Sequence, residues 1–200
     1  MNTKAQISYF LIISIVLVIS MILVAAIVRQ SDKLNTEFET LSTNEIATFV
    51  EFCIAQVGGA AIYFIGMQGG YFTLPNGEFG AARYYNKGEN TMPTLLEIEK
   101  ELEEYVNTEL QFCIEGFKDF REQGISITSQ ESETKIHITP EEILFNVIFP
   151  LTIVEEGVTT RINTFSTTIT NIELYTVYTL LQEFIEDQVQ HPDICLSCMS

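Results

Sequence analysis

The run of 20 residues from Tyr9 to Val28 carries no charged side chain, and it constrains the chain more than any other segment. A hydrocarbon core about 30 Å thick is crossed by roughly 20 apolar residues in a helix. A helix that is apolar on all sides needs an apolar surround. We therefore expect this segment to be a transmembrane helix whose partner is the lipid bilayer.

The rest of the sequence divides around this helix. Between Arg29 and Leu41 there is no Pro or Gly, so we expect the membrane helix to continue outward as a stalk. The expected organisation is a short basic leader (1–8), a transmembrane helix (9–28), a stalk (29–43), one α+β domain (44–190) and a tail with a C-x-x-C motif (191–200).

Acidic residues dominate the part of the chain after the apolar run. From Arg29 onward there are nine Lys or Arg and all 27 Asp or Glu of the chain. Such a surface repels phosphate backbones, which argues against nucleic acid as a partner. The acidity is typical of a solvated surface and names no partner by itself.

The residues on either side of the apolar run help to predict on which side of the membrane the domain lies. Lys4 precedes it while Arg29 and Lys33 come after it, so the count of positive charges is nearly balanced. A short basic N-terminus before an apolar stretch is how an export signal begins, and four cysteines suit an oxidising compartment. We expect a single-pass protein of the cell membrane with its domain outside the cytoplasm.

The residues Lys4-Ala5-Gln6-Ile7-Ser8 resemble the archaeal class III signal peptide of type IV pilin-like proteins. The resemblance implies a cut between Ala5 and Gln6 that leaves the apolar helix in the mature protein, for anchoring or for filament packing. Phe10 stands at the fifth mature position, which commonly carries an acidic residue in that family. The whole chain, including Gly66 to Tyr71, also resembles uncharacterised membrane-anchored proteins of small-genome archaea.

Three helices are expected in the domain. Ser42 with Glu45 and Thr94 with Glu97 have the spacing of capping boxes, and Gly69-Gly70 should end the first helix after Met67. Thr170 with Glu173 should cap the last helix. Gly58 and Gly59 lie inside the first helix and indicate the close approach of a neighbouring element.

Between Gly124 and Ile169 the apolar period changes to two, which predicts an antiparallel sheet of about four strands packed by two or three helices. Glu155-Glu156-Gly157 should form a hairpin turn. Pro150 cannot donate to a ladder, so it must lie at an edge or a bulge. Residues 71–93 are rich in turn residues and aromatics and could form a further hairpin.

The four cysteines fall into two groups. Cys53 and Cys113 lie on the apolar faces of two expected helices, where they could form a disulfide or remain buried free thiols. Cys195 and Cys198 could form a redox pair, a local disulfide or, with His191, part of a zinc site.

No catalytic constellation is recognisable. The Glu-rich face of the helix after Thr94 should be solvated rather than a source of an acid–base pair, and no phosphate-binding loop or nucleophile elbow is present. We therefore expect a non-enzymatic envelope protein for display, adhesion or assembly with other envelope proteins. The alternatives are a pilin-like subunit that assembles through its transmembrane helix and a metal-binding or thiol-redox protein using Cys195 and Cys198.

Overall fold

A computed structural model describes residue 21, residues 43–75 and residues 80–191. The chain divides into two compact units, Met1–Glu45 and Ile46–Ser200. The expected leader, nearly all of the transmembrane helix and stalk, and most of the tail lie outside the described residues. The second unit is α+β with antiparallel sheets.

The first described helix, Thr43–Met67, agrees with the helix expected before Gly69-Gly70. Both glycines have positive φ, 76° and 91°, and the Gly70 N–H donates to the Ile65 carbonyl at 2.8 Å. This i to i−5 bond is the Schellman arrangement, which satisfies a carbonyl that the helix end leaves free.

Helix α2 (Leu95–Ile114) begins at the capping box expected at Thr94 and Glu97. It buries one face, made of Ile98, Leu102, Val106, Leu110 and Ile114. The 3₁₀ turn η1 (Glu115–Phe117) and the short helix α3 (Lys118–Glu122) come after it.

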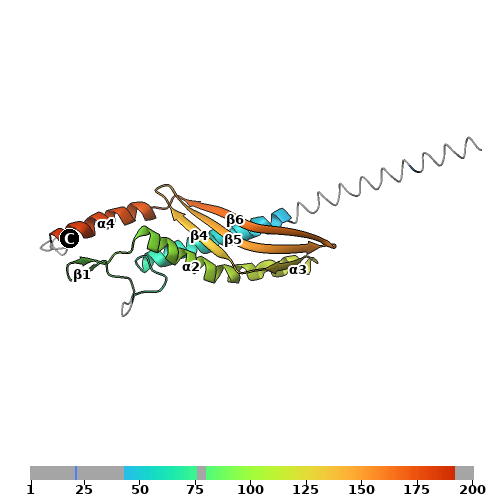
Figure 1. Cartoon of the computed structure of the whole chain (residues 1–200), viewed down its shortest axis with the longest axis horizontal. Helices are drawn as coiled ribbons and strands as arrows, with labels where there is room; N and C mark the ends of the chain where they lie inside the picture. The colour runs from blue at the N-terminus through green and yellow to red at the C-terminus, as the bar shows by residue number, and fades with distance from the viewer. Residues whose placement is uncertain (1–20, 22–42, 76–79, 192–200) are drawn as a thin grey trace, which may run out of the picture. The chain divides into compact units, whose positions relative to one another are not determined.

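The main sheet has four antiparallel strands, as predicted: β3 (Ser126–Ser129), β4 (Glu133–Ile138), β5 (Glu142–Glu155) and β6 (Val158–Thr170). Strand β5 lies at the centre. Strands β3 and β4 pair with successive parts of one edge of β5, and β6 pairs with the other edge along nearly its whole length (Figure 1).

Two predicted irregularities of the sheet are confirmed. The register between β5 and β6 shifts between Ile148 and Leu151, so Pro150 lies at a bulge. At the β5–β6 hairpin, Glu156 and Gly157 have φ of 47° and 86°, as a tight two-residue turn between twisted strands requires.

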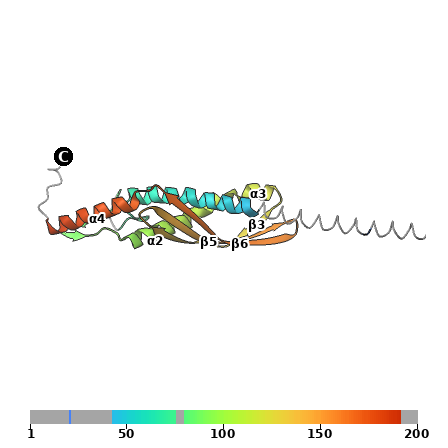
Figure 2. The same ribbon diagram turned by 90° about the horizontal axis from the view of Figure 1, so that it is seen from above.

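One face of the sheet is covered by helices and forms the core. Along β5 every second residue from Ile143 to Ile153 is buried, whereas its neighbours are partly or fully exposed. Figure 2 shows the helix Thr43–Met67, in cyan to teal, running along the covered side of the sheet. The apolar alternation of the strands therefore separates a core face from a solvent face, as a period of two predicts.

The adjacent glycines of the first helix differ in their surroundings. A Cβ built on Gly58 would lie 2.9 Å from two ring carbons of Phe145, so the helix approaches β5 closely at this residue. A Cβ built on Gly59 meets nothing within 4 Å. The expected close approach is thus confirmed for Gly58 and wrong for Gly59.

The segment after the first helix forms a small hairpin of β1 (Tyr85–Asn86) and β2 (Glu89–Asn90). Its turn, Lys87-Gly88, again has two positive φ angles. Of the aromatic residues nearby, Phe72 packs edge-on against Phe64 and Tyr105. Phe72 therefore serves as core packing.

The last helix, α4 (Leu174–Gln190), forms where it was predicted, but its expected cap is wrong. The N-cap residue is Glu173, and no side chain caps the helix there. Asn171 has a φ of 60°, so the chain turns between Thr170 and the helix, and Thr170 belongs to β6 instead.

Candidate functional site

A disulfide joins the two helices that cover the sheet. Cys53 on the first helix is bonded to Cys113 on α2, 60 positions further along the sequence, with the two Cα atoms 5.7 Å apart. Cys53 is fully buried in the core. Of the two alternatives that the sequence left open for this pair, the structure has the disulfide.

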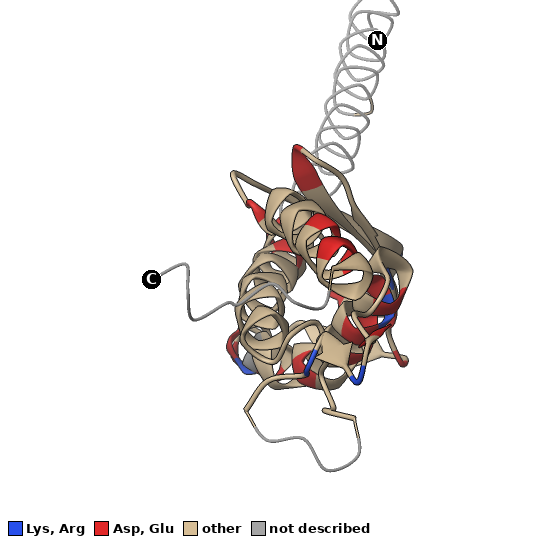
Figure 3. Ribbon diagram, turned by 90° about the vertical axis from the view of Figure 1, so that its left-hand side faces the viewer, with Lys and Arg blue, Asp and Glu red and all other residues tan. Residues whose placement is uncertain are grey.

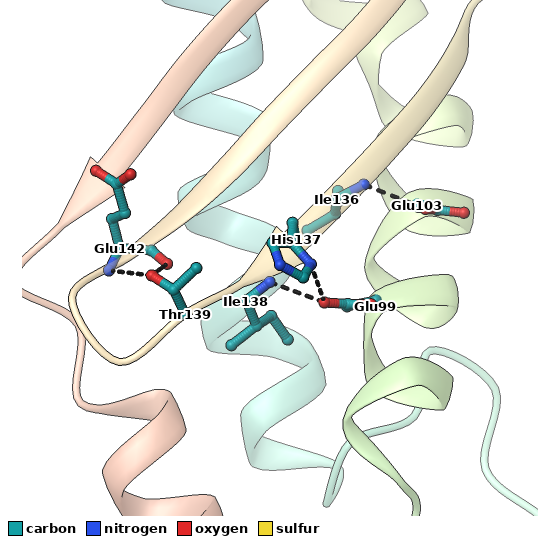
Figure 4. Close-up of polar contacts among 7 residues, drawn as sticks. All are labelled: Glu99, Glu103, Ile136, His137, Ile138, Thr139 and Glu142. Carbon is teal, nitrogen blue, oxygen red and sulfur yellow. Dashed lines mark hydrogen bonds and ion pairs between the residues drawn. The ribbon is translucent and has the colours of Figure 1, made fainter.

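Carboxylates of α2 bind the outer edge of β4 (Figure 4). The Ile138 N–H donates to Glu99 Oε1 at 2.8 Å, and the Ile136 N–H donates to Glu103 Oε1 at 3.1 Å. The side chains of Glu99 and Glu103 are only 12% and 19% exposed. The expectation that this Glu-rich face is simply solvated is therefore wrong for these two residues.

Further side chains of α2 bind neighbouring segments. Asn107, one turn after Glu103, accepts a hydrogen bond from the buried Thr134 hydroxyl at 2.7 Å. Glu101 accepts the Phe72 N–H at 2.7 Å. Because an open strand edge offers unpaired N–H groups to other strands, the α2 side chains on β4 block one edge of the sheet against such pairing.

The two histidines lie on the surface, each beside a carboxylate. His137 points to the solvent side of β4, as its alternation predicted, and its Nδ1 is 3.2 Å from Glu99 Oε1. His191 Nδ1 is 3.1 Å from Asp187 Oδ1, one turn earlier on α4. Within the described residues, the polar side chain recorded beside each histidine is thus a carboxylate and not a hydroxyl or thiol nucleophile.

The remaining predicted site residues are Cys195 and Cys198 in the C-x-x-C and Ala5 and Gln6 at the expected cut. All four lie outside the described residues. Within the described part of the chain, no group of three His, Cys, Asp or Glu side chains could hold a metal ion. The disulfide also removes Cys53 and Cys113 as zinc ligands for the C-x-x-C.

A cavity of about 760 Å³ lies between the end of α2 and the connection from β3 to β4. Amide and hydroxyl side chains, two carboxylates and one guanidinium line much of it: Asn107, Gln111, Glu115, Arg121, Ser129, Gln130, Glu131 and Ser132. Such groups can hold a polar ligand by hydrogen bonds. Sequence reasoning missed this cavity because its lining comes from three separate segments without a motif.

A second, smaller cavity of about 100 Å³ is lined mainly by apolar side chains of the first helix, α2 and α4. Tyr84 and Tyr178 also line it, and burial raises the pKa of both phenols above the ordinary value of 10.0. Both tyrosines therefore stay neutral at physiological pH, and the described lining of the cavity carries no charge.

The first helix is long and apolar. Among the described residues, Thr43–Met67 is the one helix long and apolar enough to cross a membrane by these two criteria. One of its faces, including Val50, Ile54 and Ile65, is buried in the core. The disulfide and this buried face show that Thr43–Met67 is a helix of the folded domain, and its apolar residues form part of the core.

Comparison with known proteins gives no relative: no family model, curated protein or solved structure matches this chain.

Proposed function

We propose that this chain is a membrane-anchored extracytoplasmic protein with a non-enzymatic role in display, adhesion or assembly at the cell envelope. The observation that carries the proposal is the disulfide between the buried Cys53 and the partly buried Cys113. Disulfides form and persist in oxidising compartments and are rare in the cytosol. Together with the apolar run Tyr9 to Val28, the disulfide supports a domain held on the outer side of the membrane.

The surface of the domain suits exposure to water rather than to nucleic acid. Asp and Glu outnumber Lys and Arg along the ribbon (Figure 3), in keeping with the formal net charge of −17. Carboxylates of α2 that could have formed an acid–base pair instead bind backbone N–H groups of β4.

Fractionation of cells that express the full chain tests the proposal. We expect the protein in the membrane fraction after an alkaline wash, and we expect its domain to be digested when protease is added to intact cells. Recovery in the soluble cytoplasm, or full protection of the domain in intact cells, would refute the proposal.

A pilin-like filament subunit is a second candidate, favoured by Lys4-Ala5-Gln6-Ile7-Ser8. In such a subunit the helices Tyr9 to Val28 of many copies pack together in the filament. Mass spectrometry of the mature protein separates the two candidates. A mature N-terminus at Gln6 supports the subunit, and an intact Met1 opposes it.

A further inference from the structure

The helix Thr43–Met67 has an outer face that nothing in the described chain covers. Its exposed side chains include three large apolar residues, Phe52, Tyr63 and Met67, which are 57%, 69% and 53% exposed. Figure 2 shows the helix lying along the sheet with one side turned away from the strands. Tyr63 and Met67 lie one turn apart, and exposed apolar groups that neighbour each other mark a docking surface more often than isolated ones do.

This outer face is also free of charge between Phe52 and Gly66. No Asp, Glu, Lys or Arg occurs between Glu51 and Glu78, although the chain carries 27 acidic residues. Two copies of so acidic a chain repel each other over most of their surfaces. At the face around Phe52 and Tyr63, a second copy can approach without bringing carboxylates together.

The face carries two large and three small residues at helical spacing. Positions 52, 55, 59, 63 and 66 succeed one another by three or four residues, so they share one side of the helix. Phe52 and Tyr63 are the large residues, and Ala55, Gly59 and Gly66 are the small ones. A Cβ built on Gly59 or on Gly66 meets nothing within 4 Å, so both positions are open toward solvent.

The order of these residues is self-complementary when two such helices run antiparallel. With Gly59 opposite Gly59 of the second copy, Phe52 faces Gly66 and Tyr63 faces Ala55. Each large side chain then meets a small residue, which is the condition for ridges to fit into grooves. A twofold contact requires such a surface to complement itself.

We propose that a second copy of this chain docks on the Phe52–Gly66 face of the helix Thr43–Met67, as a twofold antiparallel helix pair centred on Gly59. The proposal rests on the assembly role proposed above and names the partner in it. A monomer in the membrane fraction would refute the pair and would leave the anchor and its compartment unaffected.

The test measures the mass of the detergent-solubilised full chain by light scattering after size-exclusion chromatography. We expect a dimer. Gly59→Leu should weaken it by about tenfold or more, because the added side chain overpacks the contact between the helices. Since Gly59 faces open space within one copy, circular dichroism should show an unchanged fold.

Two further variants make the test specific. Phe52→Gln should also weaken the dimer, because it removes a ring that fills the partner's groove. Ile148→Thr is the matched control: it removes an exposed apolar group, 46% exposed, from the solvent face of the sheet. A wild-type monomer, or a dimer unaffected by Gly59→Leu and Phe52→Gln, would overturn the proposal.

Photocrosslinking in membranes identifies the occupant directly. With p-benzoylphenylalanine in place of Tyr63, the antiparallel pair predicts a covalent dimer whose crosslink lies near Ala55 of the second copy. A crosslink from position 63 to the same region of the second copy would indicate a parallel pair and overturn the proposed geometry. Crosslinks only to lipid or to another protein would exclude a second copy as the occupant.

Discussion

Glu99 connects α2 to the edge of the sheet through a single oxygen. That oxygen accepts the Ile138 N–H and lies beside His137 Nδ1. Hydrogen bonds to charged groups contribute about 1.5–3 kcal/mol, and the side chain is largely buried. We therefore expect Glu99→Ala to lower the free energy of unfolding by about 1–3 kcal/mol.

Urea unfolding of the full chain in detergent, monitored by circular dichroism, measures this effect. Glu104→Ala is the matched control, because Glu104 lies on the same helix and is exposed. Hydrogen exchange at the Ile138 amide should also become faster in Glu99→Ala than in the control. Equal unfolding midpoints for the two variants would contradict the structural role of Glu99.

Thr94 and Glu97 form the capping box of α2. Hydrogen bonds to Glu97, first from the Thr94 backbone N–H and then from its hydroxyl, lower the pKa of this exposed carboxyl below its ordinary value of 4.5. A carboxyl whose pKa is lower in the folded state than in the unfolded state stabilises the fold at pH values above its ordinary pKa. This contribution is lost as the pH falls through the pKa of the folded state.

Thr94→Ala should therefore cost about 1 kcal/mol at pH 7. Part of that cost should disappear as the pH falls through the lowered pKa of Glu97, because the carboxyl is then protonated in wild type and variant alike. Thr94→Ser keeps the hydroxyl and serves as the control. Unfolding curves at pH 7 and pH 3 provide the measurement, and a cost that grows on acidification would contradict the assigned role.

At the scale of the elements, the two adjacent glycines of the first helix should respond in opposite directions. Gly58→Ala places a methyl 2.9 Å from the Phe145 ring, and overpacking of this kind costs about 1–3 kcal/mol. Within one copy Gly59→Ala meets open space, so it should stabilise the helix of the monomer by up to about 1 kcal/mol.

Thermal unfolding of the Gly58→Ala and Gly59→Ala variants, each diluted until it is a monomer, measures the contrast. The double variant Gly58→Ala with Phe145→Leu should lose less stability than the sum of the losses in Gly58→Ala alone and Phe145→Leu alone. The smaller side chain at position 145 makes room for the added methyl. If Gly58→Ala and Gly59→Ala shift the midpoint in the same direction, the packing of the helix on β5 is not as described.

The elements also show how far the sequence could predict this fold. Local signals were sufficient for the Thr94 cap, the glycine end of the first helix, the Glu156-Gly157 turn and the bulge at Pro150, because each depends on a few neighbouring residues. The Thr170 cap was wrong because β6 extends through that residue. A strand–strand pairing over many residues outweighed a short capping pattern.

The site was less predictable than the elements. Glu103 and Glu104 are adjacent residues of the same type. Glu103 nevertheless accepts the N–H of Ile136, 33 positions away, whereas Glu104 is exposed. Which carboxylate binds the edge of the strand depends on the angle at which α2 crosses β4. No local sequence motif predicts that angle. The polar cavity escaped prediction for the same reason.

At the scale of the whole molecule, the disulfide is the main covalent constraint on the described domain. A crosslink spanning 60 residues stabilises a fold by about 4 kcal/mol on a chain-entropy estimate. The double variant Cys53→Ala with Cys113→Ala should therefore unfold at a clearly lower temperature than wild type. Changing Cys195 and Cys198 to Ser is the control, and we expect no comparable loss there.

A domain that folds outside the cytoplasm on a membrane anchor should carry its disulfide in the cell. The most direct measurement is peptide mapping by mass spectrometry, without reduction, of the protein isolated from cell membranes after free thiols have been blocked. We predict a peptide pair linked through Cys53 and Cys113, with neither cysteine blocked. Two fully blocked cysteines, or a protein found only in the soluble fraction, would contradict an extracytoplasmic, membrane-anchored domain.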